Sequence, residues 1–230
     1  TESVPKVYKI CGPGNQYVMA AKQQVSLHDV AIDMPAGPSE VAIIADETAK
    51  IGSVVADMLS QAEHGKDSQS IVFTTSQALA DALVTEVEKQ VAMAPRKDFI
   101  QCSLEHSKIF ILDSMDDVIT MSNEYAPEHL IIMCKDYAMV AEQITNAGSV
   151  FMGYYTPESA GDYASGTNHT LPTSGYAKAY SGVNLDSYLK KITFQEITHD
   201  GLQKLGDTIE IMAENEQLMA HKYAVSIRRQ

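Results

Sequence analysis

Short apolar runs rich in β-branched residues alternate with helix-length stretches over most of the chain, from residue 4 to about residue 153. Two of these runs, residues 71–73 (Ile-Val-Phe) and 109–112 (Ile-Phe-Ile-Leu), are apolar at every position. Strands of a parallel sheet read this way because helices cover both faces of the sheet. The alternation therefore predicts an α/β fold, a three-layer sandwich with a mainly parallel sheet built of Rossmann-like units.

The apolar pattern also sets the expected limits of each element. The expected strands span residues 7–10, 31–34, 41–45, 70–74, 108–112, 130–133 and 149–152. The expected helices span residues 15–25, 47–63, 76–93, 115–125 and 136–146. Asp46 and Ser76 are the expected N-caps of two of them, and Gly65 is the expected stop of the helix over 47–63.

The composition changes after Gly153. Residues 154–180 are rich in Gly, Ser, Thr, Tyr and Pro and follow no clean period. A polar stretch of this length in a compact protein is more often functional than idle. From about residue 183 the chain is mostly helical, and residues 202–219 are amphipathic. This predicts a small C-terminal helical domain.

The charge balance excludes some classes of partner. The chain has 30 acidic and 17 basic residues, a formal net charge of −13. A nucleic-acid binder needs a basic face, and so does a protein that binds an anionic membrane surface, so we expect neither partner. No apolar run approaches the length that spans a bilayer. The three cysteines are odd in number and widely spaced, which is typical of a reducing cytoplasm.

Gln61 and His64 form the first candidate site. They are three residues apart near the end of an expected helix, so they share one face of it. An amide oxygen and an imidazole at this spacing can bind one metal ion. The alternative is a solvated helix end at which His64 interacts with the carbonyl dipoles.

Glu128 and His129 form the second candidate site, at the entrance of an expected strand and directly after Pro127. These are the two commonest residue types in proton transfer. Adjacent residues on an extended segment point in opposite directions, so a shared site requires a turn or kink. The alternative is an exposed pair in a loop.

Three further motifs carry weaker signals. Asp162 lies among small residues in the polar stretch, where glycines permit close approach of a ligand, although a glycine-rich turn has the same composition. Glu216 and His221 are five apart on an expected helix, do not stack on one face and suit a surface equally well. Residues 12–15 (Gly-Pro-Gly-Asn) follow a strand and open a helix, which suits either a phosphate cradle or an ordinary turn.

Five longer strings carry a resemblance to a known family. They are Cys11-Gly-Pro-Gly-Asn-Gln-Tyr-Val18, Ala31-Ile-Asp-Met-Pro-Ala-Gly-Pro-Ser-Glu40, Leu59-Ser-Gln-Ala-Glu-His-Gly65, Glu124-Tyr-Ala-Pro-Glu-His-Leu130 and Ser159-Ala-Gly-Asp-Tyr-Ala-Ser-Gly-Thr-Asn-His169. In this order they resemble the histidinol dehydrogenase family, whose members are about twice as long, so the chain is similar to the second half. The resemblance implies that residues 1–40 end a second Rossmann-like domain. Residues 41–182 are then part of the main catalytic domain, and 183–230 form a helical dimerisation domain.

The same resemblance implies an activity. The family oxidises L-histidinol to L-histidine through L-histidinal, the last steps of histidine biosynthesis, with NAD and one zinc ion per subunit. It implies a cytoplasmic homodimer with a shared active site. His129 is then the general base, and Glu128 activates the water that hydrates the aldehyde. Asn15 contacts NAD.

The resemblance also assigns ligands. The implied zinc ligands are Gln61, His64, Asp162 and His221. The implied substrate contacts are Ser39, Gln61, His64, His129, Asp162, Glu216 and His221. In this scheme Glu216 and His221 come from the partner subunit, which explains their isolated position in the sequence.

Three alternatives stay open at this point. The first is that the chain belongs to a dehydrogenase of the same family that oxidises another amino or sulfonated alcohol. A truncated, inactive fragment of such an enzyme is the second alternative. A zinc hydrolase is the third, because the four implied zinc ligands could also hold a nucleophilic water.

Overall fold

A parallel sheet forms the centre of the computed structural model, which describes residues 3–28 and 30–230. The chain divides into two compact units, Thr1–Tyr188 and Leu189–Gln230. The sheet of the first unit has the order β5-β4-β3-β6-β7, and every neighbouring pair is parallel. Its strands are β3 (Glu40–Ala45), β4 (Gln69–Thr74), β5 (Lys108–Ile111), β6 (His129–Met133) and β7 (Ser149–Met152). The predicted α/β class is confirmed.

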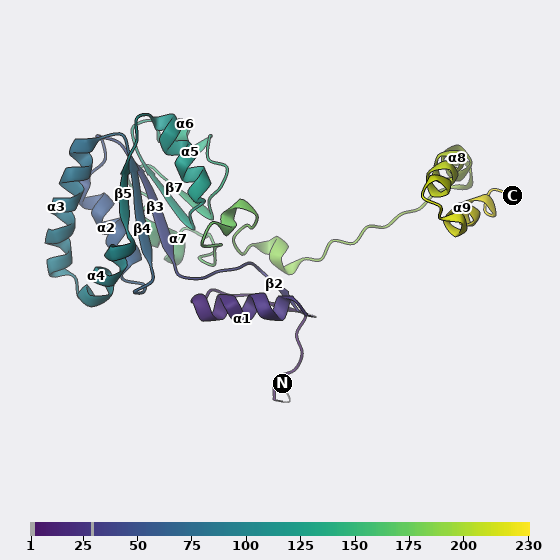
Figure 1. Cartoon of the computed structure of the whole chain (residues 1–230), viewed down its shortest axis with the longest axis horizontal. Coiled ribbons are helices and arrows are strands. Elements are labelled where there is room, and N and C mark those ends of the chain that lie inside the picture. The colour runs from purple at the N-terminus through teal and green to yellow at the C-terminus, as the bar shows by residue number, and fades with distance from the viewer. Residues whose placement is uncertain (1–2, 29) are drawn as a thin grey trace. The chain divides into compact units, whose positions relative to one another are not determined.

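Helices cover both faces of this sheet (Figure 1). On one face α2 (Ile51–Ala62), α3 (Gln77–Met93) and α4 (Lys97–His106) pack on alternate strand residues such as Val41 and Ile43. On the other face α5 (Met115–Tyr125) and α6 (Tyr137–Ala141) pack on the intervening residues, such as Ala42 and Ile44. The uninterrupted apolar runs follow from this burial on both faces.

Some expected helix limits are correct and others are wrong. Ser76 caps α3, accepting a hydrogen bond from the backbone N–H of Leu79. Asp46 does not cap α2, which begins at Ile51. The Asp46 carboxylate instead accepts hydrogen bonds from the backbone N–H groups of Thr48 and Lys135. Helix α2 ends at residue 62, three residues before Gly65, which was expected to stop it. Helix α6 ends at residue 141, five residues before its expected end at 146. Helix α4 was not expected.

The N-terminal segment forms a separate parallel pair of strands, β1 (Lys9–Ile10) and β2 (Ala31–Ile32), joined by α1 (Gln16–Ser26). Asn15 caps α1 by accepting from two backbone N–H groups. A buried ion pair between Lys22 of α1 and Asp33, directly after β2, joins the helix to the strand pair. Lys22 Nζ donates to Gly12 O at 2.9 Å, and Gly12 N donates to Asp33 Oδ2 at 2.7 Å. The pair therefore holds the turn that precedes α1.

The polar stretch expected to be irregular contains short helices: α7 (Glu158–Tyr163) and the 3₁₀ turns η1 (Tyr176–Lys178) and, just after it, η2 (Leu185–Tyr188). The second unit consists of α8 (His199–Asn215) and α9 (Met219–Ser226), which pack on each other. The amphipathic stretch over residues 202–219 is divided between α8 and α9, with Gln217 in a left-handed conformation at φ of +61°. Residues 189–198 form no helix, so the expectation of a mostly helical chain from about residue 183 is wrong for this segment. No helix in the described part of the chain is long and apolar enough to cross a membrane. The predicted domain limits at residues 40 and 182 stay predictions.

Candidate active site

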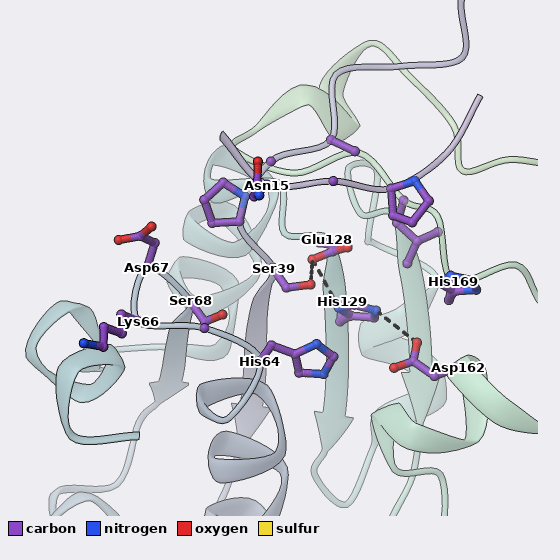
Figure 2. A pocket seen from close by; sticks show the side chains of 17 residues that line it. Asn15, Ser39, His64, Lys66, Asp67, Ser68, Glu128, His129, Asp162 and His169 are labelled. Carbon is purple, nitrogen blue, oxygen red and sulfur yellow. Dashed lines mark hydrogen bonds and ion pairs between the residues drawn. The ribbon is translucent and has the colours of Figure 1, made fainter. Parts of the chain in front are cut away.

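A cavity of about 380 Å³ opens at the amino ends of β3 and β6. Ligands of open α/β sheets usually bind at the carboxyl ends of the strands. This cavity lies at the opposite ends of the strands. Polar side chains from five segments converge there (Figure 2). The titratable and polar residues lining it are Asn15, Ser39, His64, Lys66, Asp67, Ser68, Glu128, His129, Asp162 and His169.

A left-handed residue brings Glu128 and His129 to the same cavity. Helix α5 ends with Ala126 as its C-cap, at φ of +54°, and Pro127 follows. This turn supplies the kink that two adjacent residues need in order to share a site. Both side chains are nearly buried, with 5% and 3% exposed, and both line the cavity.

The start of β3 holds this pair in place. Ser39 Oγ and the backbone N–H of Glu40 each donate to Glu128 Oε2 at 2.9 Å. His129 Nδ1 lies 3.2 Å from the backbone carbonyl oxygen of Glu40 and 3.6 Å from Glu128 Oε2. One backbone residue therefore contacts both side chains of the pair.

These contacts determine the tautomer of His129. A carbonyl oxygen only accepts, so Nδ1 carries the proton of the neutral ring and Nε2 carries the free lone pair. Nε2 is buried, has no hydrogen-bond partner among the described residues, and lies 3.9 Å from Asp162 Oδ1. Burial lowers the pKa of His129 to about 4, against the smaller opposing effect of the Glu40 contact. The ring is therefore neutral at pH 7, with Nε2 available to accept a proton.

His64, Glu158 and Asp162 form a group that suits a cation. One ligand atom from each lies within 4.8 Å of the others. His64 follows the end of α2, and the two acidic residues lie one turn apart on α7. Nitrogen and carboxylate oxygen are normal donors for zinc.

Glu158 is a residue that the sequence reasoning missed. Its side chain is almost fully buried, and Oε2 has no hydrogen-bond partner in the described chain. Burial, with smaller contributions from Asp162, Glu128 and Asp57, raises the pKa of Glu158 to about 9. Its spacing of four from Asp162 would have indicated a shared helix face, had a helix been expected in the polar stretch.

Gln61 is fully buried, and neither its Oε1 nor its Nε2 has a hydrogen-bond partner among the described residues. Leaving a buried polar group unpaired costs about 1–3 kcal/mol. Glu158 Oε2 and His129 Nε2 belong to the same set of buried side-chain atoms without a hydrogen-bond partner among the described residues. Such a set fits a bound polar or cationic ligand.

Not every predicted site residue reaches the cavity within the first unit. Asn15, Ser39, His64 and Asp162 line it together with the Glu128–His129 pair, and so does His169, which was not predicted to have a role. Gln61, a predicted ligand, is not among the lining residues. Glu216 is the C-cap of α8 and His221 lies on α9, both exposed in the second unit. The first unit by itself does not bring those two residues to the site.

Comparisons with known proteins agree on one family. The family model described as histidinol dehydrogenase matches residues 1–229. A histidinol dehydrogenase of Bacteroides fragilis is 63% identical over 228 residues, and that of Haemophilus influenzae is 54% identical. Each alignment covers 99% of this chain and 53% of the relative. The crystal structure of histidinol dehydrogenase from Elizabethkingia anophelis superposes with a TM-score of 0.94 at 56% identity, over 99% of this chain and 53% of that one. The chain thus spans about half the length of the relatives it matches.

Proposed function

The chain belongs to the histidinol dehydrogenase family, and on that premise we propose that it carries the catalytic half of an NAD-dependent zinc oxidoreductase. The proposed reaction oxidises L-histidinol to L-histidine through L-histidinal, the last steps of histidine biosynthesis. The observation that carries the proposal is the buried Glu128–His129 pair facing the acidic and histidine residues of the cavity. A homodimer and a cytoplasmic location are parts of the same proposal.

His129 is proposed as the general base. Its free Nε2 faces the cavity and accepts the proton of the substrate hydroxyl as the hydride leaves. The hydrogen bond from Nδ1–H to the Glu40 carbonyl holds the ring in this tautomer and stabilises the imidazolium that forms. His129 would act again when the hydrated aldehyde loses its proton in the second oxidation.

Glu128 is proposed to activate the water that hydrates the aldehyde. Its Oε2 is held by Ser39 and by the Glu40 backbone. Burial raises its pKa to about 8, against the lowering effect of those hydrogen bonds. A carboxyl group with a pKa near physiological pH exchanges protons efficiently in both directions. Ser39 is also the proposed substrate contact.

The proposed metal ligands are Gln61, His64 and Asp162, with His221 supplied by the second copy of a homodimer. The unpaired buried amide of Gln61 supports this assignment, because a cation gives its oxygen a partner. When bound, zinc supplies positive charge that holds the imidazole and amine of the substrate. Glu216 of the second copy is proposed to contact the same substrate.

The turn at residues 12–15 is the proposed NAD contact. Asn15 lines the cavity and caps α1, and the Lys22–Asp33 ion pair holds the turn from behind. Backbone N–H groups at a helix N-terminus suit a phosphate. NAD supplies the hydride acceptor, and the role of these residues is to position it.

The test measures two quantities on the purified chain. The first is zinc content per chain, with His64→Ala as the variant and His106→Ala, on the exposed end of α4, as the matched control. The second is histidinol-dependent NADH formation, with and without the N-terminal half of the Bacteroides fragilis relative. We expect about one zinc per chain, lost only in His64→Ala.

The outcomes separate the proposal from its alternatives. NADH formation with histidinol, undiminished by excess of other amino or sulfonated alcohols, supports the proposed substrate. Turnover only when the N-terminal half is added assigns catalysis to the longer protein. Absence of turnover in both preparations, in the presence of bound zinc, would refute the proposed activity for this chain.

A further inference from the structure

Glu40 uses its backbone and its side chain on two different networks. Its N–H and C=O contact Glu128 and His129, as described above. Its carboxyl group does not face the catalytic pair. Instead Glu40 Oε1 accepts from the backbone N–H of Ser174 at 2.9 Å, and Oε2 lies 3.4 Å from the hydroxyl oxygen of Tyr125. The carboxyl group therefore anchors the residue whose backbone holds the pair.

Tyr125 connects this anchor to a third strand. Its hydroxyl donates to Gln69 Oε1 at 2.7 Å, at the start of β4, and Gln69 Nε2 donates to the backbone carbonyl of His106 at 2.8 Å. Burial raises the pKa of the Tyr125 hydroxyl, so it keeps its proton as a donor. The first residues of β3 and β4 are thus tied to the end of α5.

Tyr125 stands at the start of the turn that leads from α5 to Glu128 and His129. Tyr125 is the last residue of α5, directly before the left-handed Ala126, and three residues before Glu128. The hydroxyl donates its single proton to Gln69 and lies 3.4 Å from Glu40 Oε2 at one end of the turn. The Glu40 backbone contacts Glu128 and His129 at the other end. The side chains of Tyr125, Glu40 and Gln69 therefore hold the turn in place, and the proposed reaction does not use them.

We propose that Tyr125 and Glu40 are positioning residues: their buried side-chain network sets the tautomer and placement of His129 and the orientation of Glu128. The proposal rests on the proposed function, because the benefit of this placement is realised in proton transfer. Its geometric part, the tautomer of His129, can be measured without turnover. Loss of the network is expected to affect chemistry more than substrate binding, since neither side chain lines the described cavity.

Tyr125→Phe is the informative variant. It removes the hydroxyl and keeps the ring, which packs edge-on against Phe73 at a centroid distance of 6.2 Å. Tyr154→Phe is the matched control, because it removes a hydroxyl that pairs with Thr48 outside the cavity. Glu40→Gln keeps an oxygen for the Ser174 N–H and a polar group for Tyr125, whereas Glu40→Ala removes both.

The first readout is the ¹⁵N spectrum of histidine-labelled 230-residue chain, with the His129 signals assigned from a His129→Gln sample. The native chain and Tyr154→Phe should show a protonated Nδ1 and an unprotonated Nε2. Tyr125→Phe and Glu40→Ala should show exchange between tautomers, and Glu40→Gln should restore the native signal. A native His129 spectrum in Tyr125→Phe would overturn the proposal.

The second readout is kinetic, on the chain supplied with the N-terminal half of the Bacteroides fragilis relative. We expect Tyr125→Phe to lower kcat about 10- to 100-fold, with KM for histidinol within about twofold and a larger deuterium isotope effect on the alcohol oxidation. A merely destabilised enzyme would lose active fraction and keep the native isotope effect, which would contradict the proposal. No turnover in the native protein would refute the proposed function, and the spectrum would then decide the positioning role alone.

Discussion

Replacing Gln61 by methionine is expected to stabilise the metal-free chain and to abolish its stabilisation by zinc. Gln61 is 0% exposed, and both polar atoms of its amide are buried without a partner among the described residues. Methionine has nearly the same length and shape and contains no group that needs a hydrogen bond. A buried amide that destabilises the metal-free chain is expected to gain its hydrogen-bonding or coordinating partner from a ligand.

The size of both effects follows from the burial of Gln61. An unpaired buried amide costs about 1–3 kcal/mol, so its removal should raise the melting temperature of the metal-free chain. For a protein of this size 1 kcal/mol corresponds to about 2–4 °C, so a gain of ~2 kcal/mol gives a rise of about 4–8 °C. Zinc at 100 times its Kd should stabilise the native chain by about 2.7 kcal/mol, or ~5–11 °C. The variant should lose most of that second shift.

The assay is thermal unfolding of the native chain and of Gln61→Met, each with chelator and with a zinc titration. Gln90→Met is the control, because the Gln90 amide on α3 donates to Gly52 O and to Glu86. This variant should be destabilised and should keep the zinc shift. A Gln61→Met chain that is less stable without metal and still gains the full zinc shift would refute the assignment of Gln61 as a ligand.

Three further predictions concern residues around the site. Burial raises the pKa of Glu158 to about 9, so folding retains a proton that the unfolded chain releases above pH 4.5. The metal-free chain should therefore lose stability as pH rises from about 4.5 to 9, and Glu158→Gln should flatten this slope in unfolding measured across that range. Lys22→Met should destabilise the chain by about 3–5 kcal/mol in urea unfolding, because it leaves the buried Asp33 carboxylate without its cation, and a smaller loss in Lys22→Met combined with Asp33→Asn would confirm the cause. Gly148→Ala would bring a Cβ within 2.5 Å of the backbone oxygen of Glu128. It should therefore reduce both the stability of the chain and the proposed histidinol oxidation. Native activity in this variant would contradict the tight packing at this position.

The strand pattern was predictable because parallel strands are apolar at every position. All five strands of the main sheet were expected within one residue of their observed limits. Helix α4 was missed because it is only ten residues long, and only Ile100 and Ser103 in it are buried. The amphipathic pattern over residues 202–219 did not show the break at the left-handed Gln217. Local pattern does not show where packing of one helix on another favours a break.

The sequence identified most of the residue types at the site, but it did not predict which of them come together in space. Spacing along the chain linked Gln61 to His64 through one helix turn, since that relation is local. It did not predict that Glu158 would join His64 and Asp162, because α7 lies in a stretch with no helical period. It also favoured an exposed position for the Glu128–His129 pair, whereas both side chains are almost fully buried.

The sequence by itself determined the α/β class and the family, because buried strands and long motif strings are local properties of the chain. Only the tertiary structure decided the tautomer of His129, the unpaired burial of Gln61 and the contacts of Glu40 with the Glu128–His129 pair. These properties depend on contacts between residues 80 or more positions apart in the sequence, such as those joining Ser39 and Glu40 to Glu128 and His129. Hydrogen bonding and desolvation act through space, so they exist only once the sheet has brought β3 and β6 together.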